Sequence, residues 1–166
     1  MLSNALVAVL LLASPRVIER VVAVVDDRPV LLSEVRLAQQ VRGGDEHEAR
    51  ESLIDEHLMF AAALRLPQAA LTDAEEGAAL AALTDRLPGA GGDPDALRRM
   101  ARRQATILKY VDFRFRPQVR VTASDPAEKA RLEAEDLDAR IEAWVKDLRA
   151  AARVRYNEVS TVPATR

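Results

Sequence analysis

The acidic residues that could supply acid–base chemistry in this chain are poorly placed for it. The pairs Glu75/Glu76 and Glu133/Glu135 fall on the polar faces of predicted helices, whereas hydrolases set two carboxylates across a substrate in a cleft. The sequence also contains no glycine-rich phosphate loop, no nucleophile elbow and no His-Glu-x-x-His zinc pair. Solvated helix faces therefore explain these carboxylates better than catalysis does.

Histidine and cysteine chemistry is equally restricted. The only histidines, His47 and His57, stand ten residues apart, so their side chains cannot meet on one turn of a helix. His57 lies beside Leu53 and Phe60 in an apolar stretch, where we expect a hydrogen-bonded structural histidine. Cysteine is absent, which excludes disulfides, thiolate catalysis and thiol-held metals. We predict no catalytic residue, no metal, no cofactor and no enzyme activity.

The strongest charge feature is basic. Residues 94–120 contain eight Arg and Lys residues against Asp95 and Asp112, a pattern that could indicate nucleic-acid binding. Two acidic stretches oppose it, with six acids against one base in residues 45–57 and eight against four in residues 122–148. We therefore expect these charges to neutralise one another within the chain. A basic helical nucleic-acid-binding protein of the cytoplasm stays an alternative.

Composition favours one mainly α-helical domain. The 166 residues are 49% hydrophobic and 30% charged, as in a folded globular protein, and the chain is long enough for one core. Alanine and leucine dominate, while aromatic residues make up 4%, which argues against a stacking platform for single-stranded nucleic acid. The net charge of −2 is too small to imply a polyanionic partner.

The first predicted elements are a β-hairpin and a short helix. Two β-rich runs between Val17 and Leu32 surround Asp26-Asp27, and Pro29 predicts a short second strand at a sheet edge. Ser33 is a natural N-cap for a helix over Glu34–Val41, which Gly43-Gly44 would end.

Four longer helix starts follow. Asp45/Glu48 and Thr72/Glu75 have capping-box spacing, and Asp93-Pro94 and Asp125-Pro126 are typical helix starts. The helix after Asp45 is the most apolar, and we expect it to form the centre of the core until Leu66-Pro67 ends it. The helix from Asp93 should run to about Phe115, with one packing stripe of Leu97, Ala101, Gln104, Leu108, Val111 and Phe115.

The C-terminal part should complete the same domain. The last helix has an apolar face of Leu132, Leu137, Ile141, Trp144, Val145 and Leu148. Residues Val154–Val159 alternate as a half-buried strand does. Trp144 should be buried against the N-terminal part, and the strand should pair with the N-terminal runs. We therefore predict a single domain over residues 15–159, with residues 126–159 completing it and residues 160–166 forming a flexible tail.

The N-terminus resembles an export signal. Residues 1–14 carry no charged side chain and include the apolar run Ala5–Ala13, which suits a signal peptide but is too short to span a membrane. We predict export, with no stable membrane insertion after the signal is removed.

The order of these elements resembles the N-terminal domain of SurA-type periplasmic chaperones. The stretches that carry the likeness are the Asp26-Asp27 hairpin, Leu53-Ile54-Asp55-Glu56, Leu64-Arg65-Leu66 before Thr72-Asp73-Ala74-Glu75, and the helix and strand from Trp144 to Tyr156. Members of that family carry inserted parvulin-type isomerase domains. Here only 22 residues separate Val121 from Trp144, so such a domain has no room.

The resemblance implies an ATP-independent periplasmic chaperone that binds unfolded outer-membrane β-barrel proteins and limits their aggregation. Its partners would be extended polypeptides, with no nucleic acid expected. A peptidyl-prolyl isomerase by family descent is the alternative that the missing domain opposes. The adaptable or amphipathic side chains of Met59, Met100, Tyr110 and Phe113 are candidates for client binding, although core packing is the commoner role for each.

Overall fold

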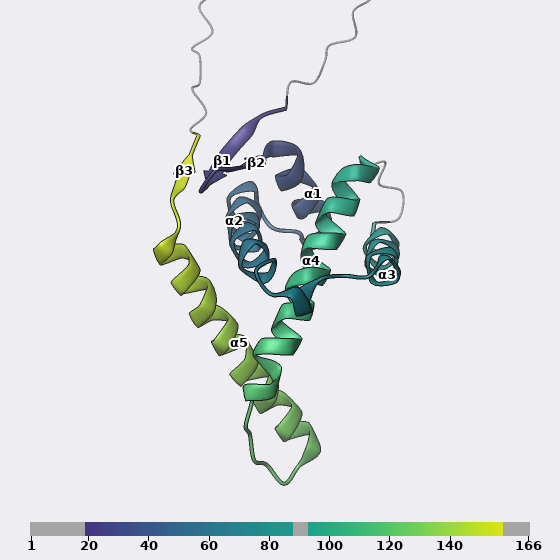
Figure 1. The fold of residues 1–166 in the computed structure, drawn as a ribbon, viewed down its shortest axis with the longest axis vertical. Coiled ribbons are helices and arrows are strands. Elements are labelled where there is room, and N and C mark those ends of the chain that lie inside the picture. Colours follow the sequence, from purple (N-terminus) through teal and green to yellow (C-terminus); the bar gives the residue numbers. More distant parts are fainter. Residues whose placement is uncertain (1–18, 88–92, 158–166) are drawn as a thin grey trace, which may run out of the picture.

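The computed structural model describes residues 19–87 and 93–157 (Figure 1). Within these ranges the fold is mainly α-helical, as predicted, with five α-helices, two 3-10 turns and one three-stranded antiparallel sheet. The elements in chain order are β1 (Val21–Val25), β2 (Arg28–Leu31), α1 (Leu32–Arg42), α2 (Glu46–Ala63), η1 (Pro67–Ala69), α3 (Asp73–Asp85), α4 (Pro94–Arg114), η2 (Arg116–Gln118), α5 (Pro126–Ala151) and β3 (Val154–Tyr156). The predicted signal peptide at residues 1–14 and the tail at 160–166 lie outside the described residues.

The sheet joins the two ends of the described chain. Its strand order is β2-β1-β3, and β1 pairs antiparallel with both neighbours. The predicted hairpin is confirmed, with Asp26 at φ 54° in its turn. Pro29 lies on β2, an edge strand as predicted. The backbone amide of Asp26 donates to the carbonyl of Arg153 at 2.8 Å. The predicted pairing of the C-terminal strand with the N-terminal hairpin is therefore confirmed over Val154–Tyr156, while Glu158 and Val159 of the predicted strand lie outside the described residues.

Helix α1 begins earlier than predicted, because β2 continues into it without a turn. Leu31 occupies the cap position, and its amide donates to Oε2 of Glu34 at 3.2 Å. Ser33 therefore lies inside the first turn and is not the cap. Its hydroxyl donates to Oε2 of Glu19 at 2.8 Å, and this bond lowers the pKa of Glu19.

The other helix starts follow the sequence signals. Asp45 accepts from the amide of Glu48 at 2.8 Å, and Glu48 accepts from the amide of Asp45 at 3.2 Å. Thr72 and Glu75 form the same reciprocal pair at the start of α3. Both predicted capping boxes are confirmed. They fix the N-terminal ends of α2 and α3.

Two apolar clusters hold the helices together. The main one contains side chains of the sheet, α1, α2, α3 and the first half of α4, and its centre is α2, where Leu53 and Ile54 are fully buried. The smaller one gathers Ala63, Ala69, Tyr110, Val111 and Phe115. Helix α2 contacts α1, α4, α5 and β1, which confirms its predicted central position.

Helix α5 is the least buried of the described α-helices. None of its residues is fully buried, and Figure 1 shows its first turns extending beyond the body while its last turns approach α2. Trp144 stacks on Tyr110 with ring centroids 4.8 Å apart and lies 5.3 Å from the ring of Phe115. Trp144 thus packs on the N-terminal part as predicted, but it is only half-buried.

Candidate functional site

An open apolar groove lies between α2, α4 and α5, with a volume of about 350 Å³. We call it the α2–α4–α5 groove. Its walls are mostly apolar, and its polar groups come from α1, α2 and α4. The lining residues are Arg42, Ser52, Glu56, Met59, Gln104, Ile107, Leu108, Val111 and Ile141. Apolar side chains with a few polar groups at one end are typical of a binding site.

The groove exists because part of α4 extends past the side chains that pack against it. Its N-terminal half packs into the main cluster, and Val111 packs into the smaller one. Leu108 lies one turn before Val111 and is 58% exposed. This overturns its predicted place in the packing stripe of α4. Ile141 reaches the groove from α5, but that helix does not come near enough to cover Leu108.

A buried ion cluster lies behind the polar end of the groove. The Nε of Arg103 donates to Oε1 of Glu56 at 2.6 Å, and its Nη1 donates to Oε1 of Glu34 at 3.2 Å. Glu56 also accepts from Arg42, whose other terminal nitrogen donates to Oγ of Ser52 at 2.6 Å. The side chains of Arg103, Glu56 and Glu34 are 5–9% exposed. One guanidinium thus joins α1, α2 and α4, and this cluster fixes the polar end of the groove.

His57 lies against this cluster. Its Nε2 is 3.9 Å from Oε2 of Glu34, and this buried nitrogen has no hydrogen-bond partner within the described residues. The prediction of a hydrogen-bonded histidine is therefore wrong for Nε2. Burial lowers the pKa of His57, and the nearby Arg103 lowers it further. The imidazole is neutral at neutral pH and packs as an uncharged ring.

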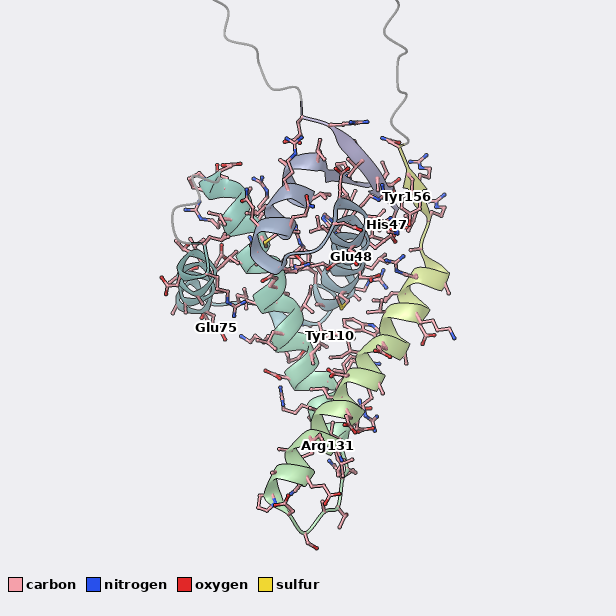
Figure 2. All side chains as sticks on the ribbon, turned by 180° about the vertical axis from the view of Figure 1, so that it is seen from behind. His47, Glu48, Glu75, Tyr110, Arg131 and Tyr156 are labelled. Carbon is pink, nitrogen blue, oxygen red and sulfur yellow. The ribbon has the colours of Figure 1, made fainter. Side chains whose placement is uncertain are left out.

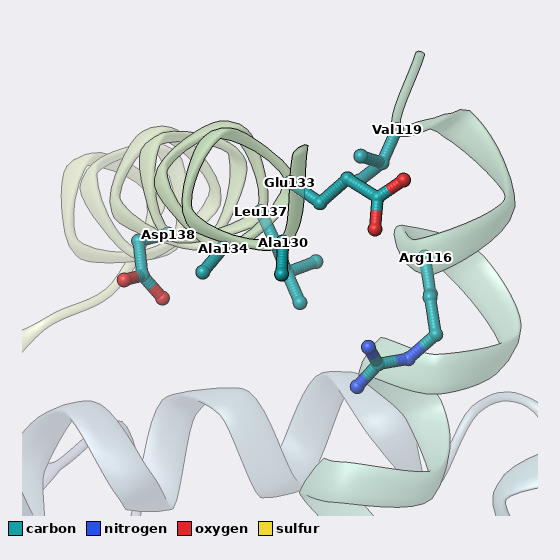
Figure 3. Close-up of a pocket in the computed structure, with 7 residues that line it drawn as sticks. All are labelled: Arg116, Val119, Ala130, Glu133, Ala134, Leu137 and Asp138. Atoms are coloured by element: carbon teal, nitrogen blue, oxygen red, sulfur yellow. The ribbon is translucent and has the colours of Figure 1, made fainter. Parts of the chain in front are cut away.

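A second hollow, of about 570 Å³, lies between η2 and the first half of α5 (Figure 3). Leu137 lines it together with the carboxylates of Glu133 and Asp138, and Arg116 lies on the opposite wall. Both carboxylates come from one helix and do not face each other across the hollow, so the arrangement does not resemble a glycosidase site. The guanidinium of Arg116 is held by Asp112 at 2.7 Å.

Each carboxylate of the acidic pairs considered for catalysis lies within ion-pair distance of a cation. Glu75 accepts from Nζ of Lys109 at 2.8 Å, which lowers the pKa of Glu75 to about 2. Glu76 lies 3.9 Å from Arg102. On α5, Glu133 and Glu135 each form an ion pair with a cation four residues earlier.

The basic stretch is neutralised within the chain, as predicted. Six of its eight cations form ion pairs with carboxylates: Arg98, Arg99, Arg102, Arg103, Lys109 and Arg116. Of their partners, only Glu56 belongs to the two acidic stretches expected to neutralise them. The other partners lie on α1, α3, α4 and the cap of α4, whereas the described acids of residues 122–148 that form ion pairs do so within α5.

The structure brings one of the four predicted client-binding residues into the groove. Met59 lines it. Met100 is 1% exposed in the main core, and Tyr110 is 8% exposed beneath Trp144, so neither offers surface to a client. Phe113 is 53% exposed but does not line the groove.

Sequence reasoning missed the other groove residues and the ion cluster. Leu108 and Ile107 were indistinguishable from core residues, because an apolar stripe in the sequence does not show which of its residues other helices pack against. Arg103 did carry a signal, since it lies three residues after Met100 and four before Ile107 on the face that α4 buries. An arginine at such a position needs buried carboxylates.

Within residues 19–87 and 93–157, no group of three or more His, Cys, Asp or Glu residues is arranged to hold a metal ion. In the same ranges no helix is sufficiently long and apolar to cross a membrane. No protein-family model matches this sequence, and no curated protein matches it at a significant level.

Proposed function

We propose that this protein is an ATP-independent chaperone that binds extended segments of unfolded outer-membrane β-barrel proteins in the α2–α4–α5 groove. The observation that carries the proposal is the apolar groove, in which Leu108 is 58% exposed. Exposed apolar surface of this kind marks sites for partners. The resemblance in element order to SurA-type chaperones supports the same function.

The groove suits transient holding better than tight capture. It is open to solvent, so a bound segment keeps much of its own surface in water. Each apolar contact contributes about 25 cal/mol per Å² removed from water. Met59 is unbranched and adapts to different side chains, while the ion cluster fixes the polar end. A client segment therefore gains cover for its apolar residues and dissociates without an energy source.

The test is an aggregation assay with an unfolded outer-membrane protein diluted from urea, followed by light scattering. We expect Leu108→Glu to reduce the suppression of aggregation, because it places a charge in the groove. Leu64→Glu is the matched control, since Leu64 is 51% exposed and does not line the groove. Equal loss in both variants, or in neither, would contradict the assignment of the groove.

We also propose that the protein is exported and has no proline isomerase activity. Residues 1–14 suit a signal peptide, so cell fractionation should find the protein in the periplasm, lacking Met1. A cytoplasmic protein that retains Met1 would exclude this location. Most cations of α4 are paired with carboxylates, so the protein has little net positive charge there to bind nucleic acid. Because client binding would then depend mainly on apolar contacts, the affinity for clients should fall only mildly as salt is added.

A further inference from the structure

The outer edge of β3 is unpaired within the described residues. β3 is the last strand of the sheet on the side opposite β2 (Figure 1). The amide of Asp26 donates to the carbonyl of Arg153, and Val24 pairs with Arg155. These residues therefore direct their backbone groups toward β1. Since an antiparallel ladder alternates, the N–H and C=O groups of Val154 and Tyr156 point outward, to the free side.

The side chains along this edge divide by face. Val154 and Tyr156 share one face because side chains alternate along a strand. Tyr156 is 46% exposed, and the guanidinium of Arg50 lies 5.2 Å from its ring centre. The flanking Arg153 and Arg155 lie on the other face and form no ion pair in the part of the chain that the structure describes. The hydroxyl of Tyr156 donates to Oε2 of Glu51 at 3.1 Å, and the amide of Arg153 donates to Oδ1 of Asp26 at 3.0 Å. The edge thus offers an aromatic side chain on one face and two arginines, next to Asp26, on the other.

We propose that β3 accepts an added strand from a client whose apolar residues alternate with acidic ones. The client's backbone would bond the outward groups of Val154 and Tyr156. Its apolar side chains would lie beside Tyr156, and its carboxylates would lie beside Arg155. Opposite charges on neighbouring strands attract, and aromatic side chains pair with apolar ones. Strands of membrane β-barrels alternate apolar with polar residues, so the inference rests on the proposed function and names a second contact for those client strands whose polar positions are acidic.

The positive charge of Arg155 disfavours a second copy of this chain as the strand that pairs with the outer edge of β3. A two-fold pairing of β3 with itself, centred on Arg155, would place two guanidinium groups side by side. Short strands with charged residues are how proteins limit pairing of their own edges. The charge that prevents self-pairing is also the charge that selects an acidic strand.

The test uses the full chain and two labelled peptides of equal length, in which apolar residues alternate with Glu or with Lys. The first measurement is amide hydrogen exchange by nuclear magnetic resonance. Strand addition should slow exchange at the amides of Val154 and Tyr156. It should leave exchange at Arg155, already bonded to β1, unchanged.

The second measurement is the affinity for each peptide by fluorescence anisotropy. Arg155→Glu should lower the affinity for the Glu peptide about threefold and raise the affinity for the Lys peptide by a similar factor.

Arg131→Glu is the matched control, because Arg131 and Tyr156 lie at opposite ends of the molecule (Figure 2). No change in either peptide's affinity on Arg155→Glu, while Leu108→Glu still weakens binding, would overturn strand addition and leave the proposed function intact. Wild-type protein that binds neither peptide and suppresses no aggregation would overturn the proposed function itself. If the amide of Val154 exchanges more slowly as the protein concentration rises, without any peptide, β3 pairs with a second copy of the chain. That result would also refute the inference.

Discussion

Replacing Arg103 with methionine should cost about 3–5 kcal/mol of unfolding free energy, because it leaves buried carboxylates without their cation. Arg103 donates at 2.6 Å to Glu56 and at 3.2 Å to Glu34. A hydrogen bond to a charged group contributes about 1.5–3 kcal/mol. Glu56 keeps Arg42 as a partner, so the larger loss falls on Glu34. Among the described residues Glu34 would keep only the amide of Leu31 as a hydrogen-bond donor, with the neutral ring of His57 3.9 Å away.

Urea denaturation followed by circular dichroism and by Trp144 fluorescence measures this cost. Arg98→Met is the matched control. Arg98 pairs with Asp95 at 3.3 Å, but its side chain is 57% exposed, so its replacement should cost less than about 1 kcal/mol. Adding Glu34→Gln to Arg103→Met should recover part of the loss, since it removes the uncompensated charge. Equal costs for the two arginines, or no recovery in the double variant, would refute the reasoning.

Two further predictions concern His57 and Trp144. The pKa of His57 is lowered in the folded protein, so the unfolded chain binds more protons below pH 6.5, and stability should fall on acidification by at most about 1.4 kcal/mol per pH unit. His57→Gln should remove this slope between pH 7.5 and 5.5 in urea titrations, and His47→Gln should not; equal slopes in all three proteins would contradict it. Trp144→Ala should cost about 2–3 kcal/mol in the same titrations, less than a fully buried tryptophan, because the ring is half-buried but stacks on Tyr110. A cost below about 0.5 kcal/mol would show that α5 is energetically independent.

Local signals predicted the elements of this fold well. Capping pairs such as Asp45/Glu48 act within four residues, so they appear in any sequence that contains them. The start of α1 was misplaced because Leu31, which no capping rule favours, occupies the cap position when a strand continues into a helix. The pairing of β3 with β1 was predictable from the need of an alternating strand for a partner.

The candidate site was much less predictable. An apolar residue on a helix reads the same whether a neighbour covers it or not, so Leu108 and Met100 looked alike in the sequence. Their exposures are 58% and 1%. The difference depends on how closely α5 approaches α4, which is a property of the tertiary arrangement. The ion cluster likewise joins residues 34, 56 and 103, whose separation in sequence leaves no local trace.

The pairing of β1 with β3 also has a consequence for the order of folding. Asp26 and Arg153 are hydrogen-bonded although they are 127 positions apart in the sequence. During synthesis from the N-terminus, the run Val21–Val25 emerges long before the strand that covers one of its edges. Contacts this remote in sequence form slowly, and an apolar strand with an open edge is prone to aggregate. The nascent chain thus carries, until Val154–Tyr156 are made, the same kind of exposed β-strand that we propose it shields in others.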